Sequence, residues 1–364
     1  MLVEVSFQSG LLRGEPLILK TPWYRPVPAV VIWFLCGASL GVLHIAAAET
    51  DSSKQELGRL AAWLQSPDEG EREDAIRELA NLHTPEAFSL MLRGLQDTNA
   101  AVRASAAWSL VLAPAGTDTI NALRNVLADD NDRVRASAIW TLAHIGGKAV
   151  LPDVVRLATN DASGIVRFRA VWGLAFIHDK SALPVAIHAL GDYNNSVRER
   201  SALLAIDSMA DKSSVIPLLL TQRAHVLPAT RRIVMYLLAK YGDASVVPAL
   251  TDGLKDPDAL VRGEAAISLG KLHARKALGA LQPALQDPDD HVRGSAAYGV
   301  GLMGDPAGVA LLRPLLKDDS AFVRAVAADS LQTLGDRTAQ PPEGFKSSEL
   351  FTFPIFSPEQ KDLY

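Results

Sequence analysis

The sequence predicts an all-α protein, an α-solenoid of about nine stacked helical hairpins, and three observations support this. Hydrophobic residues make up 48% of the 364 residues but aromatic residues only 6%, with alanine and leucine supplying much of the difference. A short signature recurs at a nearly constant interval, and turn-forming residues separate its copies. Small aliphatic residues favour closely packed helices, and one such hairpin buries its apolar faces only by stacking on neighbours.

The recurring signature is Val-Arg followed by Ala and Leu, as in 102–110 (VRASAAWSL). The signature occurs in nine copies at intervals of 31 to 33 residues, and the first copy, at Glu71-Arg72, is degenerate. Its apolar positions share one helix face, so the second helix of each hairpin is expected to begin near the Val-Arg pair. A first helix is expected before it, at segments such as Ala182–Leu190 and Val246–Leu254.

Two segments carry a family resemblance, Lys255–Gly270 (KDPDALVRGEAAISLG) and Gln286–Gly301. They resemble the HEAT repeats of phycobilisome-lyase-like proteins, and the resemblance covers roughly residues 66–339. It implies an α-solenoid made of HEAT-type hairpins. It implies little about function, because this repeat serves many unrelated binding roles.

The chain is expected to have four parts, of which the first is an export segment at residues 1–48. The run 29–43 (AVVIWFLCGASLGVL) is strongly apolar, follows Lys20 and Arg25, and precedes Ala46-Ala47-Ala48. This order is typical of a signal peptide cleaved after Ala48, and the alternative is an uncleaved anchor that tethers the chain to a membrane through residues 27–48. Both place the remainder in the periplasm, outside the cell, or on the outer side of a membrane.

The other three parts are a capping helix, the solenoid and a tail. Residues 49–65 are expected to form an N-terminal capping helix, residues 66–339 the repeats, and residues 340–364 a tail rich in proline and aromatic residues. Disordered tails are usually poor in aromatic residues, so this one is expected to dock on its own chain, with a partner-binding or free tail as the alternatives. Its five aromatic residues are Phe345, Phe351, Phe353, Phe356 and Tyr364.

An aspartate stands five residues before the Val-Arg pair in seven copies. An arginine that flanks a core needs an anionic or carbonyl partner, so the two columns are expected to form a structural ladder from repeat to repeat. Copy 6 departs from this pattern, with His225 in the aspartate position and Pro228 before the helix. The ladder residues are Asp97, Arg103, Asp129, Arg135, Asp161, Arg167, Asp192, Arg198, Asp256, Arg262, Asp287, Arg293, Asp318 and Arg324.

Six residues after the valine, a second column lies about 240° around the helix and nearly opposite the core. It carries tryptophan in three successive copies, and the second helix of such a hairpin usually lines the concave surface, so we expect a partner-binding groove there. The alternative is that the indoles fill space between neighbouring helices, beside Ala104 and Ala136. The expected partner-binding residues are Trp108, Trp140, Trp172, Phe168, Phe176, Tyr236 and Tyr298, with His144 on the same side.

Several functions are disfavoured by the composition. A net charge of −5 argues against nucleic acid as a partner, and the single Cys36 lies in the apolar N-terminal segment, so no disulfide framework is expected. No phosphate-binding loop, nucleophile elbow or His-Glu dipeptide is present, and the histidines are not expected to form one column. Neither an enzyme nor a cofactor nor a metal site is therefore expected.

The expected function is a non-catalytic, extracytoplasmic scaffold that holds a partner protein or peptide on its concave, Trp-lined surface. The alternative follows from the resemblance, which implies a chaperone-like or lyase-like accessory subunit that handles a chromophore-bearing or cofactor-bearing protein. The export segment argues against a phycobilin role, because phycobilin lyases act inside the cell.

Overall fold

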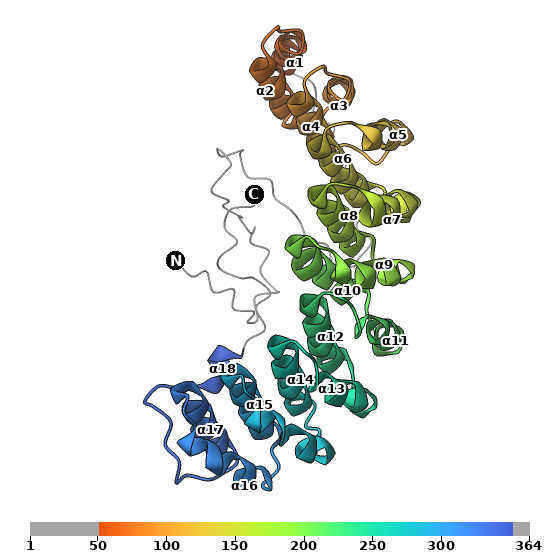
Figure 1. The fold of residues 1–364 in the computed structure, drawn as a ribbon. Coiled ribbons are helices and arrows are strands. Elements are labelled where there is room, and N and C mark those ends of the chain that lie inside the picture. Colours follow the sequence, from red (N-terminus) through yellow and green to blue (C-terminus); the bar gives the residue numbers. More distant parts are fainter. Residues whose placement is uncertain (1–50, 352–364) are drawn as a thin grey trace. The chain divides into compact units, whose positions relative to one another are not determined.

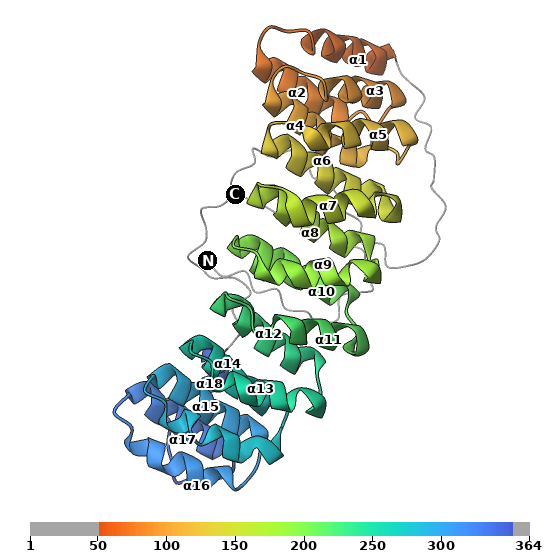
Figure 2. The same cartoon turned by 45° about the vertical axis from the view of Figure 1, so that its right-hand side comes forward.

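The structure, a computed structural model, describes residues 51–351. The expected signal peptide or anchor at residues 1–48 lies outside this range, as do Phe353, Phe356 and Tyr364 of the tail. The described part contains helices and no strand, and successive helices form antiparallel hairpins that stack in chain order (Figures 1 and 2). The predicted α-solenoid is confirmed.

The first helices of the hairpins form one layer. They are short, and several continue or begin as a turn of 3-10 helix. In copy 8 the whole first helix, Arg275–Leu281, is of the 3-10 type. The α-helices of this layer are α1 (Asp51–Trp63), α3 (Pro85–Gly94), α5 (Thr117–Asn125), α7 (Leu151–Asn160), α9 (Leu183–His188), α11 (Lys212–Gln222), α13 (Val247–Gly253) and α16 (Gly308–Leu312).

The second helices form the other layer, where most pack side by side with the second helices of the neighbouring copies. They are α2 (Glu69–Ala80), α4 (Ala100–Ser109), α6 (Asp132–Ile145), α8 (Gly164–Ile177), α10 (Ala202–Met209), α12 (Pro228–Tyr241), α14 (Ala259–Lys271), α15 (Asp290–Met303) and α17 (Ala321–Thr333). A single-turn helix, α18 (Ser347–Leu350), follows the last repeat and lies beside α15 in Figure 1.

The signature residues build the core between the two layers. In copy 2 the side chains of Val102, Ala106 and Leu110 are all 0% exposed. Alanine at the middle position lets the two helices of a hairpin approach closely, and valine and leucine fill the space on either side. Burial of this stripe, repeated in each copy, holds the hairpins in a row.

The loops between the two helices explain why each second helix begins where it does. In copy 2 the Asp97 carboxylate accepts the backbone N–H of Asn99 at 2.8 Å, and the Asn99 side chain accepts the N–H of Ala101 at 2.7 Å. The first contact closes the turn and the second satisfies an otherwise unpaired amide at the start of α4. A short sequence of the form Asp-x-Asn therefore ends one helix and begins the next.

The stacking of second helices is closest between α14 and α15. A Cβ added to Gly270 would lie 2.5 Å from the carbonyl oxygen of Gly299, so only glycine permits this approach of the two backbones. By contrast, the stacking is loose between α10 and α12, where copy 5 meets copy 6. The residues before α10, Ser196–Ser201, form a π-helix in place of an α-helical turn.

Three histidines share one position of the repeat, which corrects the expectation that the histidines form no common column. His83, His178 and His273 each follow a second helix and have φ angles of 52°, 51° and 49°. This left-handed conformation ends a helix, and histidine is among the few residues other than glycine that adopt it with some frequency. These histidines therefore have a local role as helix terminators, and they stand 95 residues apart along the chain.

Candidate functional site

The stacking of α4, α6 and α8 brings the three tryptophans of copies 2 to 4 into direct contact. Trp108 and Trp140 are parallel, with ring centroids 5.8 Å apart and planes inclined by 5°. Trp172 meets Trp140 at 4.8 Å with its plane inclined by 61°. One position of three successive helices thus forms a continuous aromatic surface, because neighbouring helices lie about 10 Å apart and an indole on each can span that distance.

Three more rings extend this surface. His144, one turn beyond Trp140, lies 4.1 Å from it, and Phe176 lies 3.9 Å from His144 and 5.2 Å from Trp140. Phe168 meets the edge of Trp172 at 5.4 Å. We call these six residues the aromatic cluster: Trp108, Trp140, Trp172, His144, Phe168 and Phe176.

The rings of the aromatic cluster differ in exposure, which corrects the expectation that all three tryptophans face solvent. Trp140 is only 9% exposed, because the rings of Trp108, Trp172, His144 and Phe176 all pack against it. Phe176 is 39% exposed, and Trp108 and Trp172 are half-buried. Packing between helices and an accessible surface therefore coexist, with the buried Trp140 supporting the exposed Phe176 and the half-buried Trp108 and Trp172.

Arg169 is the residue of this site that the sequence analysis missed. Its guanidinium carbon lies 5.3 Å from the ring centroid of Trp108, 5.2 Å from that of Trp140 and 5.8 Å from that of Trp172. A cation held over the faces of aromatic rings is attracted by their quadrupoles. The sequence signal was its place three residues before Trp172 on the same helix, which puts both side chains on one face.

His144 is held neutral at this site. Burial lowers the pKa of His144, and the nearby charge of Arg169 lowers it further. The hydrogen bond to the Trp140 carbonyl raises the pKa, but by less than burial lowers it. Its Nδ1 atom donates to that carbonyl oxygen at 2.8 Å, so the ring is fixed against α6. Near neutral pH the histidine therefore behaves as one more apolar ring of the aromatic cluster.

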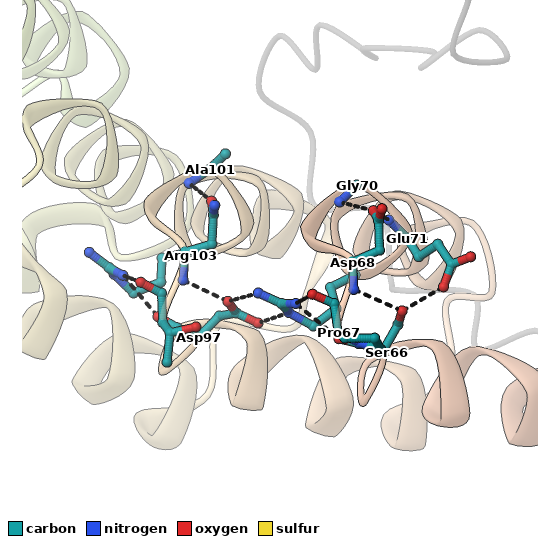
Figure 3. A network of polar contacts seen from close by, with 11 residues as sticks. Ser66, Pro67, Asp68, Gly70, Glu71, Asp97, Ala101 and Arg103 are labelled. Carbon is teal, nitrogen blue, oxygen red and sulfur yellow. Dashed lines mark hydrogen bonds and ion pairs between the residues drawn. The ribbon is translucent and has the colours of Figure 1, made fainter.

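The acidic and basic columns meet along one edge of the stacked hairpins. Each pair joins the arginine of one copy to the aspartate of the next: Arg103 Nε and Nη2 donate to the Asp129 carboxylate at 2.7 and 2.9 Å. Arg103 Nη1 also donates to the Asp97 carbonyl of its own copy at 2.8 Å (Figure 3). The pairs are Arg72–Asp97, Arg103–Asp129, Arg135–Asp161, Arg167–Asp192, Arg231–Asp256, Arg262–Asp287 and Arg293–Asp318.

Two arginines of the expected ladder have no aspartate of a following copy. Arg324 belongs to the last copy, and its guanidinium donates to carbonyls of its own loop. Arg198 faces His225 of copy 6; its Nη1 donates to the Asp192 carbonyl at 2.7 Å, and its buried Nε has no hydrogen-bond partner among the described residues. The ladder is therefore interrupted between copies 5 and 6.

Tyr298, expected to bind a partner, is covered by the chain's own C-terminal segment. The ring of Phe351 stacks on it with centroids 4.8 Å apart and planes inclined by 16°. Phe351 is 8% exposed, and the backbone N–H of Ser347 donates to the Asp329 carboxylate at 3.0 Å. The segment that ends at Phe351 thus docks on the second helices of copies 8 and 9.

Tyr236 lies in a charged environment, apart from the aromatic cluster. The Lys271 ammonium is 5.4 Å from its ring centroid. Nearby, Glu264 is 5% exposed, and Arg232 Nε lies 3.8 Å from one of its carboxyl oxygens. The other oxygen has no hydrogen-bond partner within residues 51–351, and burial raises the pKa of Glu264. The face formed by the second helices is therefore aromatic at α4, α6 and α8 and charged at α12 and α14.

Two further properties bear on function. The described residues contain no group of three or more histidine, cysteine, aspartate or glutamate side chains that could hold a metal ion. Within residues 51–351, no helix combines the length and apolar character that crossing a bilayer requires.

Comparison with known proteins gives matches to HEAT repeats and to karyopherin structures. The model of HEAT repeats matches residues 58–143, 112–175, 216–299 and 280–342, which leaves residues 176–215 unmatched. The karyopherin Kap121p, solved with the extreme C-terminus of the protein phosphatase Cdc14p, is 14% identical with a TM-score of 0.62. That alignment covers 77% of this chain and 38% of the karyopherin, so the chain spans little more than a third of the karyopherin's length.

Two other solved structures extend the comparison. Kap121p bound to Nup53p is 15% identical with a TM-score of 0.62, and the alignment covers 77% of this chain and 37% of the karyopherin. Human deoxyhypusine hydroxylase is 23% identical over 78% of this chain and 97% of its own, with a TM-score of 0.31. A search of the curated proteins found no match.

Proposed function

The chain belongs to the HEAT-repeat family, and from that premise we propose that it is a non-catalytic scaffold that binds a segment of a partner protein on its second helices. The aromatic cluster is the observation that carries this proposal. It gathers six rings and Arg169 from three successive helices, with several rings accessible and Trp140 as a rigid support.

The mechanism is complementarity on a surface that is already ordered. The rings of the aromatic cluster hold one another in place, so little conformational entropy is lost when a partner binds, and the contact buries a large apolar area. Exposed aromatic residues next to an arginine are the residue types that dominate binding energy in protein interfaces. A peptide or loop with apolar side chains fits this surface best.

Two other considerations support a protein partner and an extracytoplasmic location. The karyopherin Kap121p, which has a similar fold, is seen bound to the extreme C-terminus of Cdc14p in one structure and to Nup53p in another. The pattern of residues 1–48, with a basic flank, an apolar run and small residues at its end, favours export or a membrane tether. The partner is then another exported or membrane protein.

The test places a photo-crosslinking amino acid at Phe176, which is 39% exposed, and as a control at Tyr193, which is 81% exposed and outside the aromatic cluster. In extracts of the source cells we expect position 176 to crosslink repeatedly to one protein and position 193 not to do so. Replacing Trp108 and Trp172 by alanine should abolish the crosslink while the thermal transition remains cooperative.

Three results would contradict this proposal. Equal crosslinking at both positions, or crosslinking that survives the double alanine variant, would remove the aromatic cluster as the binding surface. An absorption band in the visible region of the purified protein would instead favour an accessory role with a chromophore, since planar rings of the aromatic cluster could stack on one.

A further inference from the structure

A second site lies on the same face, between α15 and α17 at the other end of the stacked hairpins. We call it the C-terminal slot, formed by His291, Tyr298, Phe322 and Asp329. Tyr298 and Asp329 occupy in copies 8 and 9 the position that tryptophan occupies in copies 2 to 4. The C-terminal slot and the aromatic cluster are therefore equivalent surfaces built on different copies.

The repeats themselves shape the C-terminal slot. His291 and Phe322 stack with centroids 6.0 Å apart and planes inclined by 10°, which makes a flat wall beside Tyr298. Phe322 lies directly against the backbone of α15 because Gly294 has no side chain; a Cβ there would come within 2.4 Å of the ring. These contacts do not involve the C-terminal segment, so residues of the repeats alone form the walls of the C-terminal slot.

The occupant is a single helical turn that ends in an aromatic residue. Phe351 stacks on Tyr298 and lies 6.1 Å from His291 and 6.0 Å from Phe322. At the other end of the turn the N–H of Ser347 donates to Asp329, and the N–H of Phe351 donates to the Ser347 carbonyl at 3.3 Å. Recognition thus uses one backbone amide and one ring four residues later.

The occupant fits this slot imperfectly. The Ser347 side chain is 0% exposed, yet its hydroxyl has no hydrogen-bond partner within residues 51–351. Leu350, next to the anchoring phenylalanine, is 52% exposed. A buried hydroxyl without a partner weakens binding, so a segment with alanine at this position would bind more tightly.

We infer that the C-terminal slot is a recognition site for a protein segment with a small residue followed four residues later by phenylalanine, and that Ser347–Phe351 fills it in cis as an intramolecular competitor. A partner segment of the same chemistry displaces it. This site is independent of the aromatic cluster, so either one can fail without the other.

The experiment measures binding of a labelled peptide with the sequence of residues 343–351 (EGFKSSELF) to the full chain by fluorescence anisotropy. Phe351→Ala removes the ring that fills the slot, and Leu350→Ala is the matched control because that side chain is 52% exposed. We expect Phe351→Ala to bind the peptide about tenfold or more tightly than wild type, because the apparent affinity is reduced by the fraction of chains whose slot is occupied. Leu350→Ala should bind like wild type.

Two further variants make the result specific. Adding Tyr298→Ala or Asp329→Asn to Phe351→Ala should each reduce peptide binding, and a peptide with alanine in place of Ser347 should bind more tightly than the original. The inference is overturned if Phe351→Ala binds no better than wild type, or if both added changes leave binding intact in variants whose circular dichroism is unchanged.

Discussion

Two junctions between repeats show what one aspartate does for the stacking. Where copy 2 meets copy 3, Asp129 accepts two hydrogen bonds from Arg103 and one from the backbone N–H of Asn131. Where copy 5 meets copy 6, His225 stands in the same position and its Nδ1 accepts the N–H of Leu227 at 3.1 Å. Histidine thus keeps the task of closing the loop but loses the task of binding the arginine of the preceding copy.

Several departures from the regular pattern occur near this second junction. The buried Arg198 lacks a partner at Nε, the turn before α10 is a π-helix, α10 and α12 stack loosely, and the HEAT-repeat model leaves residues 176–215 unmatched. A π-helical turn widens the helix by one residue per hydrogen bond, which fits a place where the regular spacing is not enforced. The arginine–aspartate pair that joins two copies, which we call a rung of the ladder, therefore helps the apolar stripe to set the contact between neighbouring hairpins.

The largest expected effect is on the free energy of unfolding when the ladder arginine is replaced at the intact junction, Arg103, and it is compared with the same change at the interrupted junction, Arg198. Arg103→Met should lower the free energy of unfolding by about 2–4 kcal/mol, because it leaves the largely buried Asp129 carboxylate without its guanidinium. Arg198→Met should lower it by less than about 1 kcal/mol, because methionine keeps the apolar stem and no carboxylate of the next copy loses a partner. Urea denaturation measures both, and equal losses would show that the rungs do not differ in energy.

A smaller effect is expected from repairing the interruption. His225→Asp supplies the missing carboxylate to Arg198 and should raise the free energy of unfolding by about 1–2 kcal/mol. His225→Asn is the control, since it can accept the same backbone N–H but carries no charge. Hydrogen exchange of the amides in α10 measures the local effect, and slower exchange in the asparagine variant than in the aspartate variant would contradict the proposed repair.

The smallest effect is a pH dependence confined to the second junction. Burial, together with the charges of His188, Arg231 and Arg198, lowers the pKa of His225 below its ordinary value of 6.5. The unfolded chain therefore binds this proton more readily, and the contribution of neutral His225 to stability is lost as pH falls below 6.5.

His225→Gln removes this titration, so its junction should exchange amide hydrogens at a rate less dependent on pH than that of wild type, once intrinsic exchange is corrected for. The intact junction responds differently, because the hydrogen bond from Arg103 lowers the pKa of Asp129 and its stability is lost only as pH falls below the usual range of a carboxylate. A wild-type profile that matches the glutamine variant between about pH 7.5 and pH 5.5 would contradict the assignment.

The sequence by itself determined the hairpin architecture and the alignment of its columns. A helix places positions 0, 4 and 8 of the signature on one face, and a repeat of constant length places equal positions of successive hairpins side by side. From this it follows that Val102 and Leu110 are buried, that Arg103 reaches the next aspartate, and that Trp108, Trp140 and Trp172 meet. The interruption at His225 was visible too, as a change of one residue type in a column.

Only the tertiary structure decided how accessible the members of each column are. Trp140 is buried because rings from both neighbouring helices close over it, Arg169 belongs to the site because four rings lie around it, and Tyr298 is covered by a phenylalanine more than fifty residues later. The physical reason is that a periodic pattern fixes the direction of a side chain, whereas its exposure depends on the sizes and conformations of residues contributed by other helices and by the C-terminal segment.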